Sequence, residues 1–436
     1  MKILNLKILA LTVASISGVF GIVPAQAATV LQQVKTVFVI PMENHNFTQP
    51  NPTSSPRQIF TNPAAPYINS LITVGNSNAV QVSYATKYYN AGVGEHPSEP
   101  NYVWSEAGSN LGDLADNDPS AASANVFTNN HLTRQLNVAG IAWKNYQEDV
   151  QLSASPTNSA SGTSATTINP YYGTGDYFYA VKHNPMAFFT DTQTQNVYAL
   201  TNLFNDLTNN TVGRYNWITP NIYDDMHSPL SGGFTYHGVS YTGDQAGIAQ
   251  GDNFLSILIP KIMASSAYKD HGVIILWNDE TEGGDTTNYA MTEIIISPLA
   301  KGNAYASSVE MNHSSDLKTM EEIFGLAYLS NTIPAGETAV TGSGYNNVAT
   351  VNDLSDMFLA APNIVSGQLL PGAGGFQLTF SGPARQTYHV LASNNLTMPQ
   401  SAWSVLDGGT FGNTNAIFTD TGATNYLGRF YSITSP

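Results

Sequence analysis

The most distinctive pattern in the sequence is an unbroken apolar run at residues 36–42 that ends in polar side chains. The run is short, rich in β-branched residues and without polar alternation, which is typical of a strand buried on both faces of a parallel sheet. Ligands of such sheets bind beyond the carboxyl ends of the strands. Glu43 and Asn44 follow the run directly and offer oxygen donors for a divalent cation. The alternative is a polar turn without function.

A second apolar run of the same kind lies far downstream, at residues 272–277. Asp279 and Glu280 follow it, and glycines at residues 283–284 turn the chain close to this edge. Two buried strands that both end in oxygen donors are the arrangement that a composite metal site requires. This repetition favours the metal site over the polar turn.

Strand-like and helix-like patterns alternate over most of the chain. The strand-like patterns lie at residues 80–84, 140–146, 217–222 and 293–298. The helix-like patterns lie at residues 67–72, 131–137 and 312–326. This alternation predicts an α/β fold with a mostly parallel sheet flanked by helices.

The pattern changes near the C-terminus to short alternating strands separated by Gly, Asn and Pro turns. These strands are expected at residues 376–380, 387–391 and 430–433. We therefore expect a catalytic domain over residues 28–362 and an accessory β-sandwich over residues 363–436. The second region holds no cluster of acids or histidines.

The N-terminus has the features of a secretory signal peptide. Lys2 and Lys7 precede an apolar stretch at residues 8–23, and the small residues Ala25 and Ala27 form an expected cleavage site. A signal peptide over residues 1–27 predicts export to the periplasm or the medium. Its removal leaves no stable membrane anchor.

The amino-acid composition limits the possible metal ligands and binding partners. The chain has no cysteine, so any metal is held by oxygen and nitrogen donors. A formal charge of −16 argues against nucleic acid as a partner, because a phosphate backbone requires a basic surface. A small phosphate-containing substrate is still compatible, since a bound cation reverses the local sign of charge. Nothing in the pattern specifies an oligomeric state.

Ser98 is the candidate nucleophile. Pro100 is typical of the first turn of a helix, so Ser98 is expected just ahead of a helix N-terminus. Free N–H groups at such an end favour an anion, and a hydroxyl beside them could attack a phosphoryl group. The alternative is that Ser98 caps the helix.

Three segments together resemble a known family. Residues 39–47, 96–102 and 277–285 occur in the order and with the motifs of the bacterial phosphoesterase family of non-specific phospholipases C and acid phosphatases. That family belongs to the alkaline-phosphatase-like superfamily. The resemblance covers residues 36–358 and excludes the C-terminal region. Further matches lie at residues 140–147, 182–185, 219–227 and 313–326.

The resemblance implies a fold, a cofactor and roles for individual residues. The fold would be the alkaline-phosphatase-like sheet, with a divalent metal that could be Ca, Mg, Mn or Zn. The metal ligands would be Glu43, Asn44, Asp279 and Glu280. Ser98 would be the nucleophile, and the residues assisting it would be His227, His96, His183 and His313. A metal can activate a serine hydroxyl, and a histidine can protonate a leaving alkoxide.

These observations predict a secreted, metal-dependent phosphoesterase with a phosphoserine intermediate, of the acid-phosphatase type that acts on small phosphate monoesters. The alternative is a phospholipase C-type diesterase that acts on phospholipid head groups. A sulfatase, which shares the superfamily fold, is disfavoured as an alternative because it would need arginine at the position of Tyr102. A non-catalytic exported binding protein on the same fold is a further alternative, which the complete set of acids disfavours.

Overall fold

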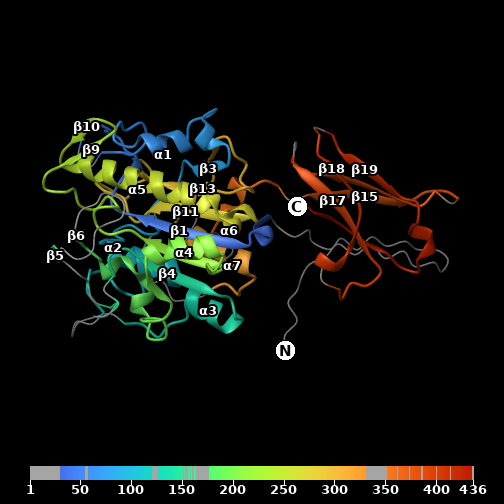
Figure 1. The fold of residues 1–436 in the computed structure, drawn as a ribbon, viewed down its shortest axis with the longest axis horizontal. Coiled ribbons are helices and arrows are strands. Elements are labelled where there is room, and N and C mark those ends of the chain that lie inside the picture. The colour runs from blue at the N-terminus through green and yellow to red at the C-terminus, as the bar shows by residue number, and fades with distance from the viewer. Residues whose placement is uncertain are drawn as a thin grey trace. The chain divides into compact units, whose positions relative to one another are not determined.

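A computed structural model provides the structure of the chain. It describes residues 30–434 except for the gaps at residues 55–56, 120–125, most of 151–175, 330–350, 361, 373, 384–385, 399 and 413. The signal peptide expected at residues 1–27 lies outside the described residues. Val34–Phe358 form one compact unit, and the chain from Leu359 onward belongs to another (Figure 1).

The larger unit is built on an eight-stranded sheet with the order β14-β3-β13-β11-β1-β8-β4-β7. Its strands are β1 Thr36–Met42, β3 Val82–Ala85, β4 Trp143–Gln147, β7 Val197–Ala199, β8 Tyr215–Thr219, β11 Gly272–Asn278, β13 Glu293–Ile296 and β14 Tyr305–Ser307. Among them only β13 runs antiparallel to its neighbours. The predicted mostly parallel sheet is confirmed.

Strands β1 and β11 are neighbours at the centre of this sheet. Each is buried at all seven positions, as their continuous apolar character requires. They pair in parallel, and Met42 lies opposite Asn278. The next residues, Glu43 and Asp279, therefore emerge side by side at the carboxyl edge of the sheet.

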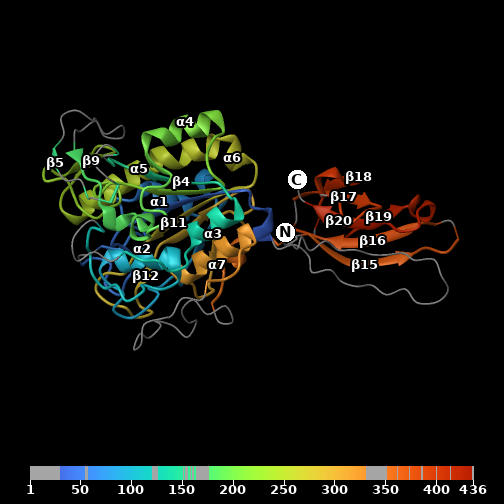
Figure 2. The same ribbon diagram turned by 90° about the horizontal axis from the view of Figure 1, so that it is seen from below.

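Helices cover both faces of the sheet (Figure 2). On one face lie α1 Pro66–Leu71, α4 Thr201–Asn209, α5 Asp244–Ala264 and α6 Ser266–Lys269. On the other lie α2 Ser98–Ala107, α3 Leu132–Ala139 and α7 His313–Phe324. Helix α7 begins at a capping box formed by Asn312 and Ser315 and ends at Gly325 in the left-handed conformation, as its sequence predicts.

Helix α5 is a long helix that the sequence pattern does not predict. It contains Gly247, Gly251 and Pro260, which break the helical pattern. The glycines permit close packing: a Cβ on Gly251 would lie 2.4 Å from the side chain of Met226. The helix thereby supports the loop that follows β8.

Short elements complete the larger unit. They are the strand pairs β2 Asn46–Thr48 with β12 Ala290–Met291, β5 Gly162–Thr163 with β6 Asp176–Tyr177, and β9 Phe234–Tyr236 with β10 Val239–Tyr241. Single 3-10 turns lie at η2 Ser77–Ala79, η3 Val181–His183, η4 Pro185–Phe188 and η5 Leu354–Met357, and η1 Val30–Gln33 precedes the unit.

The C-terminal unit contains two antiparallel sheets of three strands each, in the orders β15-β16-β19 and β18-β17-β20. The strands are β15 Asn363–Leu369, β16 Phe376–Ser381, β17 Thr387–Ser393, β18 Ser404–Thr410, β19 Ala416–Asp420 and β20 Phe430–Thr434, with turns η6 Gln400–Ala402 and η7 Ala423–Asn425. Side chains from both sheets, such as Phe380 and Val390, share one core. The small all-β module predicted from the alternating pattern is thus present. In the described part of the chain, no helix is long and apolar enough to span a membrane.

Candidate active site

Ser98 and Glu43 meet at the carboxyl edge of the central sheet. The hydroxyl of Ser98 donates a hydrogen bond to Oε2 of Glu43 over 2.8 Å. Ser98 is the first residue of α2, so the helix begins one position earlier than the sequence predicts, and Pro97 occupies the N-cap without a side-chain bond. Both Ser98 and Glu43 are buried. The hydroxyl of Ser98 is therefore directed at a carboxylate and not at the helix backbone.

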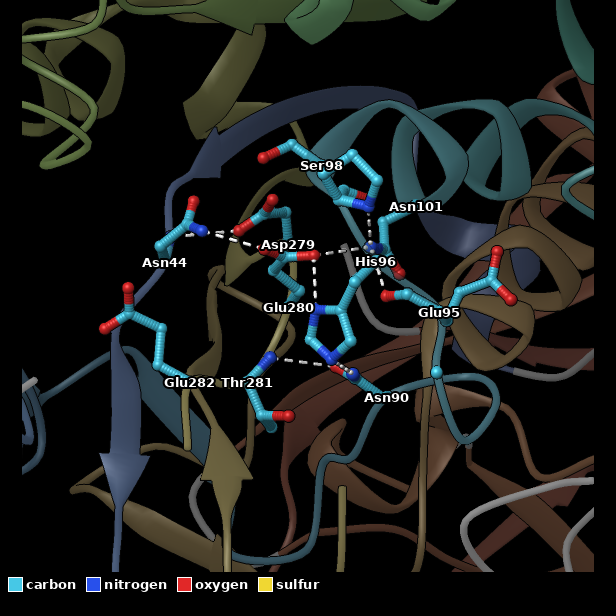
Figure 3. Close-up of polar contacts among 12 residues, drawn as sticks. Asn44, Asn90, Glu95, His96, Ser98, Asn101, Asp279, Glu280, Thr281 and Glu282 are labelled. Carbon is cyan, nitrogen blue, oxygen red and sulfur yellow. Dashed lines mark hydrogen bonds and ion pairs between the residues drawn. The ribbon is translucent and has the colours of Figure 1, made fainter. Parts of the chain in front are cut away.

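Asn44 connects the ends of the two central strands. Its backbone N–H donates to Oδ1 of Asp279 over 3.0 Å, and its side-chain amide donates to Oε1 of Glu280 over 2.8 Å (Figure 3). Among the described residues, Oδ1 of Asn44 and Oδ2 of Asp279 are buried oxygen atoms without a hydrogen-bond partner. Two oxygen donors are thus left free in a polar site.

His96 is bound between two carboxylates. Its Nδ1 lies 2.7 Å from Oε2 of Glu280, and its Nε2 lies 2.9 Å from Oδ1 of Asp285. The hydrogen bond to Glu280 is the main cause that raises the pKa of His96 to about 9, against the effect of burial. His96 is accordingly an imidazolium. Because both nitrogens are engaged, it orients Glu280 and partly neutralises this acidic site.

His183 lies between Glu43 and Asp225. Its Nε2 is 3.0 Å from Oε1 of Glu43, and its Nδ1 is 3.0 Å from Oδ2 of Asp225. All three side chains are fully buried. Neither contact has hydrogen-bond geometry, since among the described residues both ring nitrogens and Oδ2 of Asp225 have no hydrogen-bond partner.

This arrangement fits a bound cation. Burial lowers the pKa of His183 well below its usual value, so the ring is neutral and carries a single N–H. At least one ring nitrogen then directs a lone pair at a carboxylate oxygen. Glu43, His183 and Asp225 present ligand atoms within 4.8 Å of one another, which is a spacing that a metal ion could bridge. Burial also raises the pKa of Asp225, as expected for a carboxylate that lacks a counter-ion.

Two groups of donors therefore share Glu43. The first is the set predicted from sequence, in which Asn44 and Asp279 offer free oxygens. Both oxygens of Glu280 already accept hydrogen bonds, from Asn44 and His96. The second contains His183, which the sequence analysis considered a catalytic assistant, and Asp225, which it did not assign. Asp225 could have been suggested by the sequence, because the apolar run of β8 is followed by the two acids Asp224 and Asp225.

His227 stands at the rim of the site. Its ring centroid lies 5.9 Å from that of His183, and its Nδ1 lies 3.0 Å from the hydroxyl of Ser228. The residue is exposed to solvent. Desolvation by its neighbours lowers its pKa, although the charge of Glu43 opposes this shift. An exposed imidazole beside the buried acids could exchange protons with a substrate.

His313 is held by protein groups on both sides of its ring. Its Nε2 lies 2.5 Å from the backbone carbonyl of Asp279, and its Nδ1 lies 2.6 Å from the hydroxyl of Tyr88. Burial lowers its pKa to about 4. Both ring nitrogens of His313 thus contact protein groups at the end of β11, and its catalytic role stays a prediction.

Comparison with known proteins shows the family of this chain. The sequence pattern of the Phosphoesterase family matches residues 44–327. The chain belongs to this family. It is 31% identical over 137 residues to a probable acid phosphatase of Kluyveromyces lactis, a match covering 30% of each protein. It is 31% identical over 138 residues to an acid phosphatase of Aspergillus fumigatus, covering 30% of this chain and 28% of the relative. These matches span less than a third of the relatives' lengths.

Two solved structures align with this chain at low sequence identity and low TM-score. An alkaline phosphatase superfamily protein of Vibrio parahaemolyticus aligns with a TM-score of 0.42 at 11% identity, covering 82% of this chain and 79% of that chain. The lipoteichoic acid synthase LtaP of Listeria monocytogenes aligns with a TM-score of 0.44 at 11% identity, covering 88% and 85%.

Proposed function

We propose that this protein is a metal-dependent phosphoesterase, of the acid-phosphatase type, that hydrolyses small phosphate monoesters through a phosphoserine at Ser98. The observation that carries the proposal is the hydrogen bond from the buried Ser98 hydroxyl to Glu43, in a group of acids where, among the described residues, Oδ2 of Asp279 and Oδ2 of Asp225 have no hydrogen-bond partner. Membership of the Phosphoesterase family and the acid phosphatase relatives support the same reaction class.

In the first half-reaction, Oγ of Ser98 attacks phosphorus and the ester oxygen leaves. Oε2 of Glu43 accepts the hydrogen bond of this hydroxyl and is the acceptor in place for its proton. The leaving alkoxide needs a proton, and His227 at the solvent-exposed rim is the residue proposed to supply it. The products of this step are the free alcohol and phosphoserine.

In the second half-reaction, water attacks the phosphoserine, the bond between phosphorus and Oγ breaks, and inorganic phosphate is released. Glu43 returns its proton to Oγ, which regenerates the Ser98 hydroxyl. His227, now deprotonated, is suited to accept a proton from that water, which restores its starting state. Tyr102 donates to Oε1 of Glu43 over 2.7 Å and keeps this carboxylate in one orientation throughout.

The divalent metal would be held by Glu43, with Asn44 and Asp279 or with His183 and Asp225. When bound, it would offset the charge of the phosphoryl oxygens and lower the pKa of the Ser98 hydroxyl. Export of the protein, inferred from residues 1–27, is part of the same proposal.

The function is tested by turnover of three substrates: a phosphomonoester, a soluble phosphodiester and phosphatidylcholine in vesicles, each with and without EDTA. We expect the monoester to be hydrolysed fastest, activity to be lost on chelation and restored by a divalent metal. Faster cleavage of phosphatidylcholine would favour the phospholipase C-type alternative. No turnover of any ester by the metal-loaded protein would refute the proposed function.

A further inference from the structure

Lys182 has no role in the mechanism above, yet it lies beside the site. Its Nζ forms an ion pair with Oδ2 of Asp116 at 2.8 Å. The two side chains are 21% and 29% exposed, so the pair is partly open to solvent. Lys182 belongs to the 3-10 turn η3, immediately before His183.

Both members of the pair are anchored next to central site residues. Oδ1 of Asp116 accepts the backbone N–H of Glu99 at 3.1 Å, and Glu99 directly follows Ser98. On the other side, His183 contacts Glu43. The pair therefore connects the start of helix α2 to the turn that carries His183.

Lys182 carries its positive charge close to the acids of the site. Desolvation lowers the pKa of Lys182, but Glu43, Asp116 and Asp279 together raise it, so the side chain is an ammonium ion. Its positive charge in turn adds to the burial that lowers the pKa of His183, and it opposes the burial that raises the pKa of Asp225.

We propose that Lys182 binds a non-bridging phosphoryl oxygen of the substrate and so selects phosphomonoester dianions over phosphodiester monoanions. This inference rests on the proposed function and specifies its substrate class. The occupant of the site would be a terminal phosphate group, and Asp116 would hold the ammonium group at the rim when no substrate is bound.

The selection follows from charge and geometry. The carboxyl groups of the site, such as Glu43 and Asp279, repel a dianion. The imidazolium of His96 does not offset this repulsion, because it is already paired with Glu280 and Asp285. An ammonium group is a compact charge that binds phosphate as a point cation. A monoester presents one more non-bridging oxygen and one more negative charge than a diester, and Lys182 would interact with both.

The test compares Lys182→Met and Lys182→Arg with Lys144→Met. Lys144 is a matched control, because it also forms a 2.8 Å ion pair, with Asp206, and is 19% exposed. The measurements are calorimetric binding of inorganic phosphate and kcat/KM for one phosphomonoester and one phosphodiester, on metal-loaded proteins. Lys182→Gln repeats the test should the Met variant fold poorly.

We expect Lys182→Met to weaken phosphate binding about 10- to 100-fold, as is typical for the loss of a charged hydrogen bond. The monoester-to-diester ratio of kcat/KM should fall by a similar factor, Lys182→Arg should recover part of it, and Lys144→Met should match the wild type. An unchanged ratio and unchanged phosphate binding in Lys182→Met would overturn the inference while leaving the proposed function intact. A wild type that neither binds phosphate nor hydrolyses an ester would overturn both.

Discussion

Ser98 and Glu43, 55 positions apart in the sequence, are joined by a hydrogen bond of 2.8 Å between two buried side chains. The contact exists because the first turn of α2 lies over the carboxyl end of β1. Burial of a carboxylate and a hydroxyl is costly unless each finds a partner, and here each group is the partner of the other. Ser98 is also close enough to Asp279 to lower its pKa, against the larger effect of burial.

Glu43→Gln and Asp279→Asn should each lose metal and activity while the protein stays folded. The amide keeps the size of the side chain but is a much weaker metal ligand than a carboxylate. Metal content by elemental analysis, together with turnover, measures the effect. Asp252→Asn serves as the control, because Asp252 is equally buried but accepts the backbone N–H groups of Tyr67 and Ile68, away from the site. Full metal content in an inactive Asp279→Asn protein would contradict its role as a ligand.

Tyr88→Phe should weaken metal binding although Tyr88 is not a ligand. Loss of its hydroxyl removes the partner of His313, which positions the backbone carbonyl of Asp279. Removal of such outer contacts typically costs about 10- to 100-fold in metal affinity. Tyr268→Phe is the control, since its buried hydroxyl donates to Gln81 elsewhere in the unit. Equal metal affinities for the two variants would show that the contact has no such role.

A chain that ends at residue 362 should fold and hydrolyse a small soluble phosphate ester. The site residues all belong to the compact unit Val34–Phe358, and the C-terminal unit has a hydrophobic core of its own. Circular dichroism and turnover of a monoester measure the outcome. Loss of turnover in a well-folded truncated protein would assign part of the active site to the C-terminal unit.

Glu321→Gln should stabilise the protein on the alkaline side of the pH range. Burial raises the pKa of Glu321 from 4.5 to about 8, so the stability that depends on its buried protonated form is fully present below pH 4.5 and is lost as the pH rises through 8. Gln keeps the acceptor for the backbone N–H of Leu329. The variant should gain on the order of 1 kcal/mol over the wild type near pH 8 compared with pH 5, measured by urea unfolding. If the free energy of unfolding depends on pH in the same way for both proteins, the raised pKa of Glu321 is contradicted.

Much of the fold could be predicted because its strongest signals are local. The apolar runs of β1 and β11 specify buried strands, and Asn312 and Gly325 mark the two ends of α7. Helix α5 could not be predicted in this way. Its glycines are explained by close packing against Met226, which only the folded chain reveals.

The site was predictable to the level of its motifs but not of its contacts. The residues that follow β1 and β11 emerge together because parallel neighbours end at the same edge. The grouping of Asp225 with His183 depends on the turn after β8, and a run of two acids does not specify which of them lies beside His183. For His313, the packing of α7 against the end of β11 directs the ring at a backbone carbonyl, a contact that no spacing in the sequence encodes.

The central claim is that Ser98 forms a covalent phosphoryl intermediate. Ser98→Ala should keep its metal and its phosphate binding but lose turnover by several orders of magnitude, since the attacking atom is absent. Were Ser98 only a helix cap, the same change would cost about 1 kcal/mol of stability and leave turnover nearly intact.

The most direct measurement is mass spectrometry of the wild-type protein after acid quenching during turnover of a slow phosphomonoester. The account predicts a phosphate adduct on the peptide that contains Ser98, and no adduct in Ser98→Ala. Absence of the adduct in the wild type, together with a near-normal rate for Ser98→Ala, would contradict it.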